Sequence, residues 1–251
     1  MNRTFVIGDI HGDFDALETV LSRLPKMDDQ DTIVFLGDYV DRGPDSAKVV
    51  ELVRNGMPNR FPAKIVALIG NHEDAWLRVR SKGWAEFVLP VGNGCLATLR
   101  SFTGGPVPVS EEIPGTHEFH SMFAADFFPA DVIDWFASLP VFYEDEHAIY
   151  VHAGLPKVDG RFVHPSELEN PRPLLWERSR EFFTEYDGKR VVFGHTVAIS
   201  MPQELSAYTP EDYKDLFYYK SVVGIDTGCG HGGFLTAIEL PGLRVYESRN
   251  P

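Results

Sequence analysis

Short apolar runs recur along this chain, and each leads directly into polar side chains accompanied by glycine. Residues 32–36 are the clearest run, because they are apolar or β-branched throughout and are followed by Gly37 and Asp38. Runs of this length and composition are typical of buried strands. The other four runs, at residues 4–7, 63–69, 148–151 and 190–193, lead to Asp9, His11, Asn71, His152 and His195. Because open α/β sheets bind ligands at the carboxyl ends of their strands, we expect one shared site.

The segments between these predicted strands have the periodicity of helices. Leu17, Val20, Leu21 and Leu24 form the stripe of an amphipathic helix, which makes residues 4–36 a strand–helix–strand unit with parallel strands. A second helix is expected from Pro44, ended by Gly56 and Pro58. Residues 74–82 and 129–139 also have helical patterns, and we interpret residues 75–140 as a mostly helical insertion beside the site.

After Pro140 the chain returns to strands, and further ones are expected near residues 141–144, 221–226, 233–240 and 243–247. So many short strands near the end predict a second, mixed sheet packed on the first. The predicted fold class is therefore α/β, with two mixed β-sheets packed as a sandwich and helices outside. A length of 251 residues suits one large domain over residues 1–251.

Composition and charge narrow the class of function. The chain is 43% hydrophobic and 24% charged, and no apolar run approaches membrane-spanning length. The first residues enter a strand almost at once, which leaves no room for a signal peptide, so we expect a cytoplasmic protein with no membrane partner. The formal net charge of −14 provides no basic surface for nucleic acid. Cys95 and Cys229 lie far apart in sequence, and we expect free thiols.

The segment after residues 32–36 indicates the chemistry. Gly37-Asp38-Tyr39-Val40-Asp41-Arg42-Gly43 combines two carboxylates with a guanidinium. Carboxylates bind hard cations, and the planar fork of arginine suits phosphoryl oxygens. This combination suggests phosphate chemistry on metal ions.

Three of these motifs resemble a known family. Gly-Asp-Ile-His-Gly, Gly-Asp-Tyr-Val-Asp-Arg-Gly and Gly-Asn-His-Glu occur here in the order found in the phosphoprotein phosphatase family of binuclear metallophosphatases. The later Val-His-Ala-Gly and Gly-His-Thr elements extend the resemblance over most of the chain, residues 75–147 excepted. The family includes eukaryotic serine/threonine phosphatases, the phage lambda phosphatase and bacterial diadenosine tetraphosphate hydrolases. The resemblance implies the calcineurin-like metallophosphoesterase fold.

The resemblance also implies a metal site of two divalent ions. Asp9, His11 and Asp38 would bind one ion, and Asp38, Asn71, His152 and His195 the other, with Asp38 bridging. A mixed set of carboxylate, imidazole and amide ligands suits Mn²⁺, Fe or Zn²⁺. Of these ions we expect Mn²⁺. Two such ions can clamp phosphoryl oxygens and generate hydroxide from a shared water.

The same resemblance assigns the catalytic and phosphate-binding residues. Arg42 and Arg178 would hold the phosphate together with Asn71 and His72, and His72 would protonate the leaving alkoxide. Asp41 would pair with the ring of His72, fix its tautomer and raise its pKa. Trp176-Glu177-Arg178 matches the Trp-x-Arg element of the phage-type members, which assigns the second phosphate-binding arginine to Arg178. Arg180 is the alternative for this role. Both are expected on a helix that begins at residue 174.

Two substrate classes remain open within this family. Asp41 and the Gly-Asn-His-Glu motif favour a serine/threonine protein phosphatase, extending to phosphotyrosine as a dual-specificity variant, with a phosphoprotein or phosphopeptide as partner. Ile-Asp-Thr-Gly-Cys-Gly-His-Gly-Gly at residues 225–233 favours the alternative, a symmetrical dinucleoside tetraphosphate hydrolase. A third interpretation, a non-catalytic metal-containing binding module, predicts a missing ligand or acid, and none is missing.

Two further side-chain sets have open interpretations. Cys229 lies on the glycine-rich turn after a predicted strand, where it is either a redox-sensitive thiol near the site or a small buried thiol. Phe119, Phe123, Phe127 and Phe128 either line a substrate groove or belong to the core. Metal identity, oligomeric state and regulators leave no readable pattern.

Overall fold

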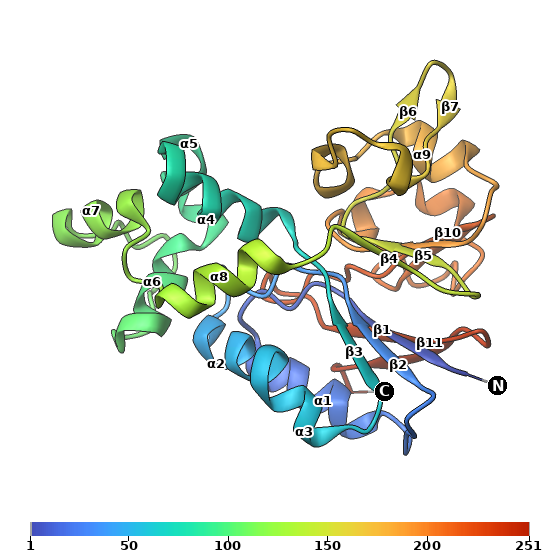
Figure 1. Cartoon of the computed structure of the whole chain (residues 1–251), viewed down its shortest axis with the longest axis horizontal. Coiled ribbons are helices and arrows are strands. Elements are labelled where there is room, and N and C mark those ends of the chain that lie inside the picture. Colours follow the sequence, from blue (N-terminus) through green and yellow to red (C-terminus); the bar gives the residue numbers. More distant parts are fainter. Residues whose placement is uncertain (1, 251) are drawn as a thin grey trace.

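The computed structural model describes residues 2–250 and contains two five-stranded sheets (Figure 1). The first sheet has the order β12-β11-β1-β2-β3, with β1–β3 parallel and β11 and β12 antiparallel. Its strands are β1 (Thr4–Ile7), β2 (Thr32–Phe35), β3 (Lys64–Ala67), β11 (Thr236–Leu240) and β12 (Arg244–Glu247). The mixed character of the sheet and the parallel pairing of β1 with β2, both predicted, are confirmed.

The second sheet has the order β4-β5-β8-β10-β9, and its three middle strands are also parallel. Its strands are β4 (Phe142–Glu144), β5 (Ile149–Val151), β8 (Val191–Phe193), β9 (Phe217–Tyr219) and β10 (Val222–Gly224). A separate hairpin is formed by β6 (Lys157–Val158) and β7 (Arg161–Phe162). Among the described residues, β6, β7 and β9 are the strands that the sequence pattern did not predict.

Side-chain alternation along the strands explains how the sheets pack. In β1, Phe5 and Ile7 join a large cluster with the helices, whereas Val6 belongs to a separate cluster that also contains Val192 and Val223 of the second sheet. Successive residues of a strand point to opposite faces, so each sheet buries both of its faces. The sheets therefore form the predicted sandwich, with apolar side chains filling the space between them.

Helices cover the outer face of the first sheet and extend beside it. Figure 1 shows α1–α3 against this sheet and α4–α8 grouped next to one end of the sandwich. The helices are α1 (Phe14–Arg23), α2 (Ser46–Glu51), α3 (Met57–Arg60), α4 (Asn71–Lys82), α5 (Ala85–Val88), α6 (Cys95–Thr103), α7 (Thr116–Ala124), α8 (Ala130–Ser138) and α9 (Arg180–Glu185). The helical insertion predicted at residues 75–140 is thus confirmed. Among residues 2–250, no helix has the length and apolarity needed to cross a membrane.

Two helix boundaries differ from the prediction. The second helix does not end at Gly56, because a π-helical turn (Leu52–Gly56) carries it into α3, where Pro58 lies in the first turn. Proline is tolerated there because the first N–H groups of a helix lack intrahelical acceptors. The helix expected from residue 174 is also wrong. Residues Arg172–Leu175 form a 3₁₀ turn that ends at Trp176, and α9 starts only after Ser179, whose hydroxyl caps it.

The four phenylalanines of the insertion pack among themselves and with the core. Phe128 is buried and packs edge-on against Trp76 and Phe136. Phe119 and Phe123 stack on each other at 5.9 Å between ring centroids. The core interpretation of these side chains therefore holds for Phe128.

Candidate active site

The predicted site residues come together where the carboxyl ends of six strands meet. Strands β1, β2 and β3 of the first sheet and β5, β8 and β10 of the second are each followed within four residues by a buried polar side chain. The predicted side chains brought together there are Asp9, His11, Asp38, Asn71, His72, His152 and His195, and Asp226 lies with them. The sandwich thus builds one site from segments that are up to 217 residues apart in sequence (226 minus 9).

The backbone is strained at these strand ends. Five non-glycine site residues have positive φ: His11 at 47°, Asp38 at 53°, Asp41 at 71°, Arg42 at 70° and His195 at 64°. A left-handed conformation costs an ordinary residue about 1–2 kcal/mol. Such strain persists only where the surrounding structure holds it in place, and its concentration here marks a functional centre.

Asp38 lies at the centre of the cluster, and its two carboxylate oxygens face different histidines. Oδ2 lies 3.3 Å from Nε2 of His11 and 3.9 Å from Nε2 of His72, while Oδ1 lies 3.5 Å from Nε2 of His152. Burial opposes the charge, but the neighbouring histidines outweigh it and lower the pKa of Asp38. One carboxylate can therefore serve two cation sites, as the predicted bridging role requires.

The hydrogen bonds of His11 and His152 fix their tautomers. Nδ1 of His11 donates to the Val40 carbonyl at 3.0 Å, and Nδ1 of His152 donates to the Leu36 carbonyl at 2.9 Å. A carbonyl oxygen can only accept, so each Nε2 presents a lone pair to the cluster. Burial lowers the pKa of both rings, which favours the neutral form. Imidazoles oriented in this way by backbone carbonyls are typical metal ligands.

Several acceptor atoms converge on the same space. The Nε2 lone pair of His11 faces the Asp38 carboxylate, and that of His152 faces Oδ1 of Asn71 at 2.8 Å. One oxygen of Asp9 accepts from the His195 amide at 2.8 Å, but its buried Oδ1 has no hydrogen-bond partner within residues 2–250. Acceptors that face one another without protons between them need a cation. The residues present therefore fit divalent metal ions.

The geometry supports two adjoining cation sites. One group of potential ligand atoms within 4.8 Å of one another comprises His11, Asp38 and His72, and another comprises Asp38, His152 and His195. Oδ1 of Asn71 lies 2.7 Å from Nδ1 of His195 and joins the second group. The buried Asp and His clusters are consistent with a binuclear metal site, and they share Asp38.

His72 and Asp41 form a buried pair beside the clusters. Nδ1 of His72 lies 2.7 Å from Oδ2 of Asp41, which leaves Nε2 facing the site. The Asp41 carboxylate also accepts from Nε1 of Trp76 at 3.1 Å and from the Thr98 hydroxyl at 2.6 Å. Burial disfavours the charged ring, but the carboxylates of Asp38 and Asp41 outweigh burial and raise the pKa of His72. The pair thus has the orientation expected of a general acid and its partner.

Glu73 organises the loop that carries Asp38, a role that the sequence analysis missed. Its buried carboxylate accepts the amide protons of Asp38 at 2.9 Å, Tyr39 at 2.9 Å and Gly70 at 3.0 Å. A side chain at Gly70 would collide with the Asp38 carboxylate, because a Cβ there would lie 2.1 Å from Oδ1. The Glu in Gly-Asn-His-Glu is therefore structural, which the motif itself did not reveal.

Arg42 and Arg178 both border the cluster. Nε of Arg42 is buried and has no hydrogen-bond partner in the described part of the chain. Nε of Arg178 donates to Nε2 of His195 at 2.8 Å. Arg180, the competing candidate, is directed to the surface, where it pairs with Glu204. The structure thus places Arg178 at the site and Arg180 outside it. Arg178 lies in the connection before α9, and only Arg180 is on a helix.

Asp226 is a further site residue that the sequence analysis missed. It is fully buried after β10, where Oδ1 accepts from the Gly228 amide at 2.9 Å. Its Oδ2 has no partner among the residues described. Burial raises the pKa of Asp226, and the nearby positive charges of Arg42 and Arg178 oppose that rise only in part. Residues 221–225 followed by Asp-Thr-Gly repeat the strand-plus-acid pattern of the first motifs, and that signal could have identified it.

The two cysteines are buried and unpaired. Cys229 is 1% exposed within the large core cluster, and burial raises its pKa well above the ordinary range for a thiol. A reactive cysteine requires thiolate character and access. The structure therefore favours the small buried thiol over the redox-sensitive one.

Comparisons with known proteins agree with this geometry. The calcineurin-like phosphoesterase family matches residues 3–198. PrpE of Bacillus cereus, an asymmetrical bis(5'-nucleosyl)-tetraphosphatase, is 24% identical over 265 residues, covering 96% of this chain and 92% of PrpE.

Solved structures share the fold at lower identity. A metallophosphoesterase from Sphaerobacter thermophilus superimposes with a TM-score of 0.53 at 19% identity, covering 99% of this chain and 88% of that one. A cold-active protein-tyrosine phosphatase of a psychrophilic Shewanella species gives 0.54 at 15% identity, covering 98% and 80%. The match over residues 3–198 takes in more than three quarters of the sequence, and this chain belongs to the calcineurin-like phosphoesterase family.

Proposed function

We propose that the protein is a metal-dependent phosphatase that hydrolyses phosphoserine and phosphothreonine esters in proteins, with phosphotyrosine as a further substrate. The observation that carries this proposal is the buried His72–Asp41 pair, held by Trp76 and Thr98. Asp41 holds the imidazole with its Nε2 toward the cation sites, and Trp76 and Thr98 in turn hold the Asp41 carboxylate. A general acid is the function that this arrangement supports best.

The proposed acid suits an ester whose leaving group is a strong base. A serine or threonine alkoxide must be protonated as it leaves, whereas a nucleotide phosphate leaves readily as an anion. General-acid catalysis is worth about 10²–10⁴-fold where it is needed. The carboxylates that raise the pKa of His72 keep its proton available near neutral pH.

Two divalent ions, for which we propose Mn²⁺ with Fe or Zn²⁺ as alternatives, would supply an activated water and charge neutralisation at the phosphoryl oxygens. Asp9, His11 and Asp38 would hold one ion, and Asp38, Asn71, His152 and His195 the other. Arg42 and Arg178 would bind the phosphoryl oxygens from outside this cluster, aided by Asn71 and His72. Nε2 of His72 would then pass its proton to the leaving oxygen, while Asp41 retains the proton on Nδ1.

A second candidate is the hydrolysis of dinucleoside tetraphosphates. It is favoured by the full-length similarity to PrpE, which is an asymmetrical enzyme and not of the symmetrical type that the sequence suggested. The Asp-Thr-Gly turn after β10 also supports it, since that turn borders the site. The full set of ligand, arginine and acid residues argues against a non-catalytic binding module.

The test compares these substrates on one preparation. The protein reconstituted with Mn²⁺ is assayed for phosphate release from phosphothreonine and phosphotyrosine peptides and for nucleotide release from diadenosine tetraphosphate. We expect kcat/KM to be highest for the phosphothreonine peptide. Efficient turnover of diadenosine tetraphosphate with little turnover of either peptide would overturn the proposal in favour of the second candidate.

A further inference from the structure

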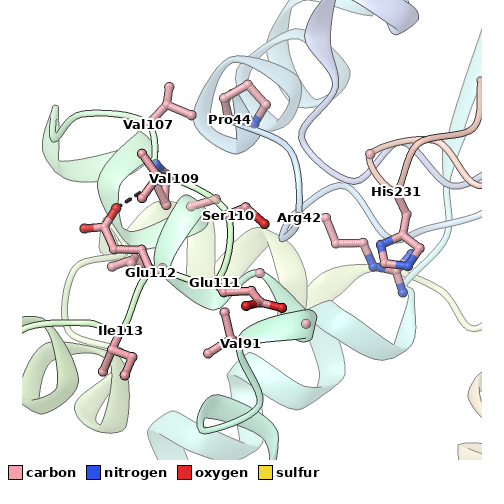
Figure 2. Close-up of a pocket in the computed structure, with 16 residues that line it drawn as sticks. Arg42, Pro44, Val91, Val107, Val109, Ser110, Glu111, Glu112, Ile113 and His231 are labelled. Atoms are coloured by element: carbon pink, nitrogen blue, oxygen red, sulfur yellow. Dashed lines mark hydrogen bonds between the residues drawn. The ribbon is translucent and has the colours of Figure 1, made fainter.

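A cavity of about 650 Å³ opens directly beside Arg42 (Figure 2). One side is the loop that joins α6 to α7, and the other includes Gly230 and His231 of the glycine-rich turn. Arg42 forms part of its wall, so the cavity and the proposed phosphate site share a residue. A substrate whose phosphate contacts Arg42 can therefore extend into this space.

The outer wall of the cavity is apolar and exposed. Val107, Val109 and Ile113 lie on the α6–α7 loop with exposed fractions of 65%, 70% and 76%, and Val91 adds a further exposed side chain. A cluster of solvent-exposed apolar side chains beside a site is typical of an interaction surface. The apolar part of the wall is aliphatic, and Phe119, Phe123, Phe127 and Phe128 do not line the cavity.

The α6–α7 loop is held in place by one arginine. The mostly buried guanidinium of Arg100 binds Glu112 at 2.5 and 3.1 Å, Glu118 at 2.8 Å and the Pro106 carbonyl at 3.3 Å. Glu112 in turn accepts the Val109 amide at 2.9 Å. The cavity wall is thus formed before any ligand binds, which reduces the entropic cost of binding.

One acidic side chain faces the cavity without a partner. Figure 2 shows the Glu111 carboxylate pointing inward, between Val91 and Ser110 and toward the side on which Arg42 lies. Glu111 is exposed and makes no side-chain hydrogen bond or ion pair within the described residues. A negative charge here repels additional phosphate groups and attracts an ammonium or guanidinium group.

We infer that this cavity binds the polypeptide next to the phosphorylated residue, with an aliphatic side chain against Val107, Val109 and Ile113 and a lysine or arginine against Glu111. The inference rests on the proposed protein phosphatase activity and adds its sequence preference. Charge complementarity selects this occupant, because a polyphosphate would bring negative charge toward Glu111. The net charge of −14 also favours cationic segments of a partner.

The test uses phosphothreonine peptides that differ at one position. Each position from four residues before to four after the phosphothreonine carries either lysine or glutamate, and kcat/KM is measured with the Mn²⁺-loaded protein. At one or more positions we expect lysine to be preferred roughly fivefold, the scale of one exposed ion pair. Glu111→Lys should abolish or reverse that preference.

Glu146→Lys provides the matched control. Glu146 is exposed and lies in the turn before β5, at the opposite end of the sheets from the site, so the same change of charge there should leave the preference intact. Thermal unfolding shows whether Glu111→Lys is folded, and Glu111→Gln, which removes the charge with little change of shape, should weaken the preference in any case.

The outcomes separate this inference from the proposed function. Turnover of phosphopeptides with a preference that Glu111→Lys leaves unchanged, or that Glu146→Lys changes equally, would overturn the inference and leave the function standing. Hydrolysis of diadenosine tetraphosphate without any phosphopeptide turnover would overturn both.

Discussion

The hydroxyl of Thr98 donates a hydrogen bond of 2.6 Å to the Asp41 carboxylate and accepts the Asp41 amide at 2.7 Å. Thr98 belongs to α6 of the helical insertion, whereas Asp41 follows β2 of the first sheet. The insertion therefore helps to hold the proposed acid pair as well as forming the wall of the neighbouring cavity. Gly94, at the start of α6, packs so closely on Arg42 that a Cβ there would lie 2.1 Å from its amide nitrogen.

Replacing Thr98 by valine keeps the shape of the side chain and removes its hydroxyl. A buried hydrogen bond to a charged group contributes about 1.5–3 kcal/mol, so we expect a comparable loss of stability and roughly a tenfold lower kcat on a phosphothreonine peptide. Thermal unfolding and steady-state kinetics measure both effects. Thr103→Val on the same helix, where the hydroxyl bonds only to the Leu99 carbonyl, should keep wild-type kcat. Equal losses of kcat in the two variants would show that Thr98 has no special relation to the acid pair.

The pH dependence of kcat reports the state of His72. The proposed acid works only when protonated, so activity should fall as the pH rises through the pKa of His72, which Asp38 and Asp41 raise against the effect of burial. Asp41→Asn removes one of the two raising charges and lowers that pKa. The alkaline fall in kcat should therefore move to lower pH in the variant. An alkaline limb that stays in place would assign it to another group.

Asp38→Asn tests the shared carboxylate. Because Asp38 faces both groups of potential ligands, its loss of charge should deplete both cation sites. Elemental analysis after Mn²⁺ loading and desalting should find close to two ions per chain in the wild type and well below one in the variant. Retention of two ions would contradict the bridging role.

Arg178 and Arg180 offer a paired comparison. Arg178 contacts His195, whereas Arg180 is bound to Glu204 on the surface. We expect Arg178→Ala to lose roughly 10–100-fold in kcat/KM, as for the loss of a charge-assisted contact to phosphate. It should also weaken inhibition by inorganic phosphate. Arg180→Ala should behave as the wild type, and the opposite ranking would return the role to Arg180.

The sequence predicted the strands and most of the site for one physical reason. A buried parallel strand must be apolar, so the polar residues that end it, such as Asp9 after β1 and His195 after β8, stand out against it. A polar side chain on a helix does not stand out in this way, because polar residues are common on helices. Trp76 and Thr98 reach Asp41 only because α4 and α6 lie against the loop that follows β2, and that packing is not encoded in local periodicity.

Local sequence also failed where prolines and caps compete with apolar periodicity. Leu174, Leu175 and Trp176 have the character of a helix start, but Pro171 and Pro173 confine this segment to a 3₁₀ turn. Ser179 then caps a new helix and leaves Arg178 in the connection, free to reach His195. The error in the helix therefore does not change which of the two arginines lies beside His195.

The general-acid role of His72 predicts that the effect of His72→Asn depends on the leaving group. An acid that protonates an alkoxide matters greatly for a phosphothreonine peptide and little for p-nitrophenyl phosphate, whose leaving group is a weak base. We predict that His72→Asn lowers kcat about 10²–10⁴-fold on the peptide and far less on the aryl ester, with metal content close to wild type. Equal losses on both substrates, or metal lost in parallel with activity, would contradict the general-acid role and make His72 a ligand or a structural residue.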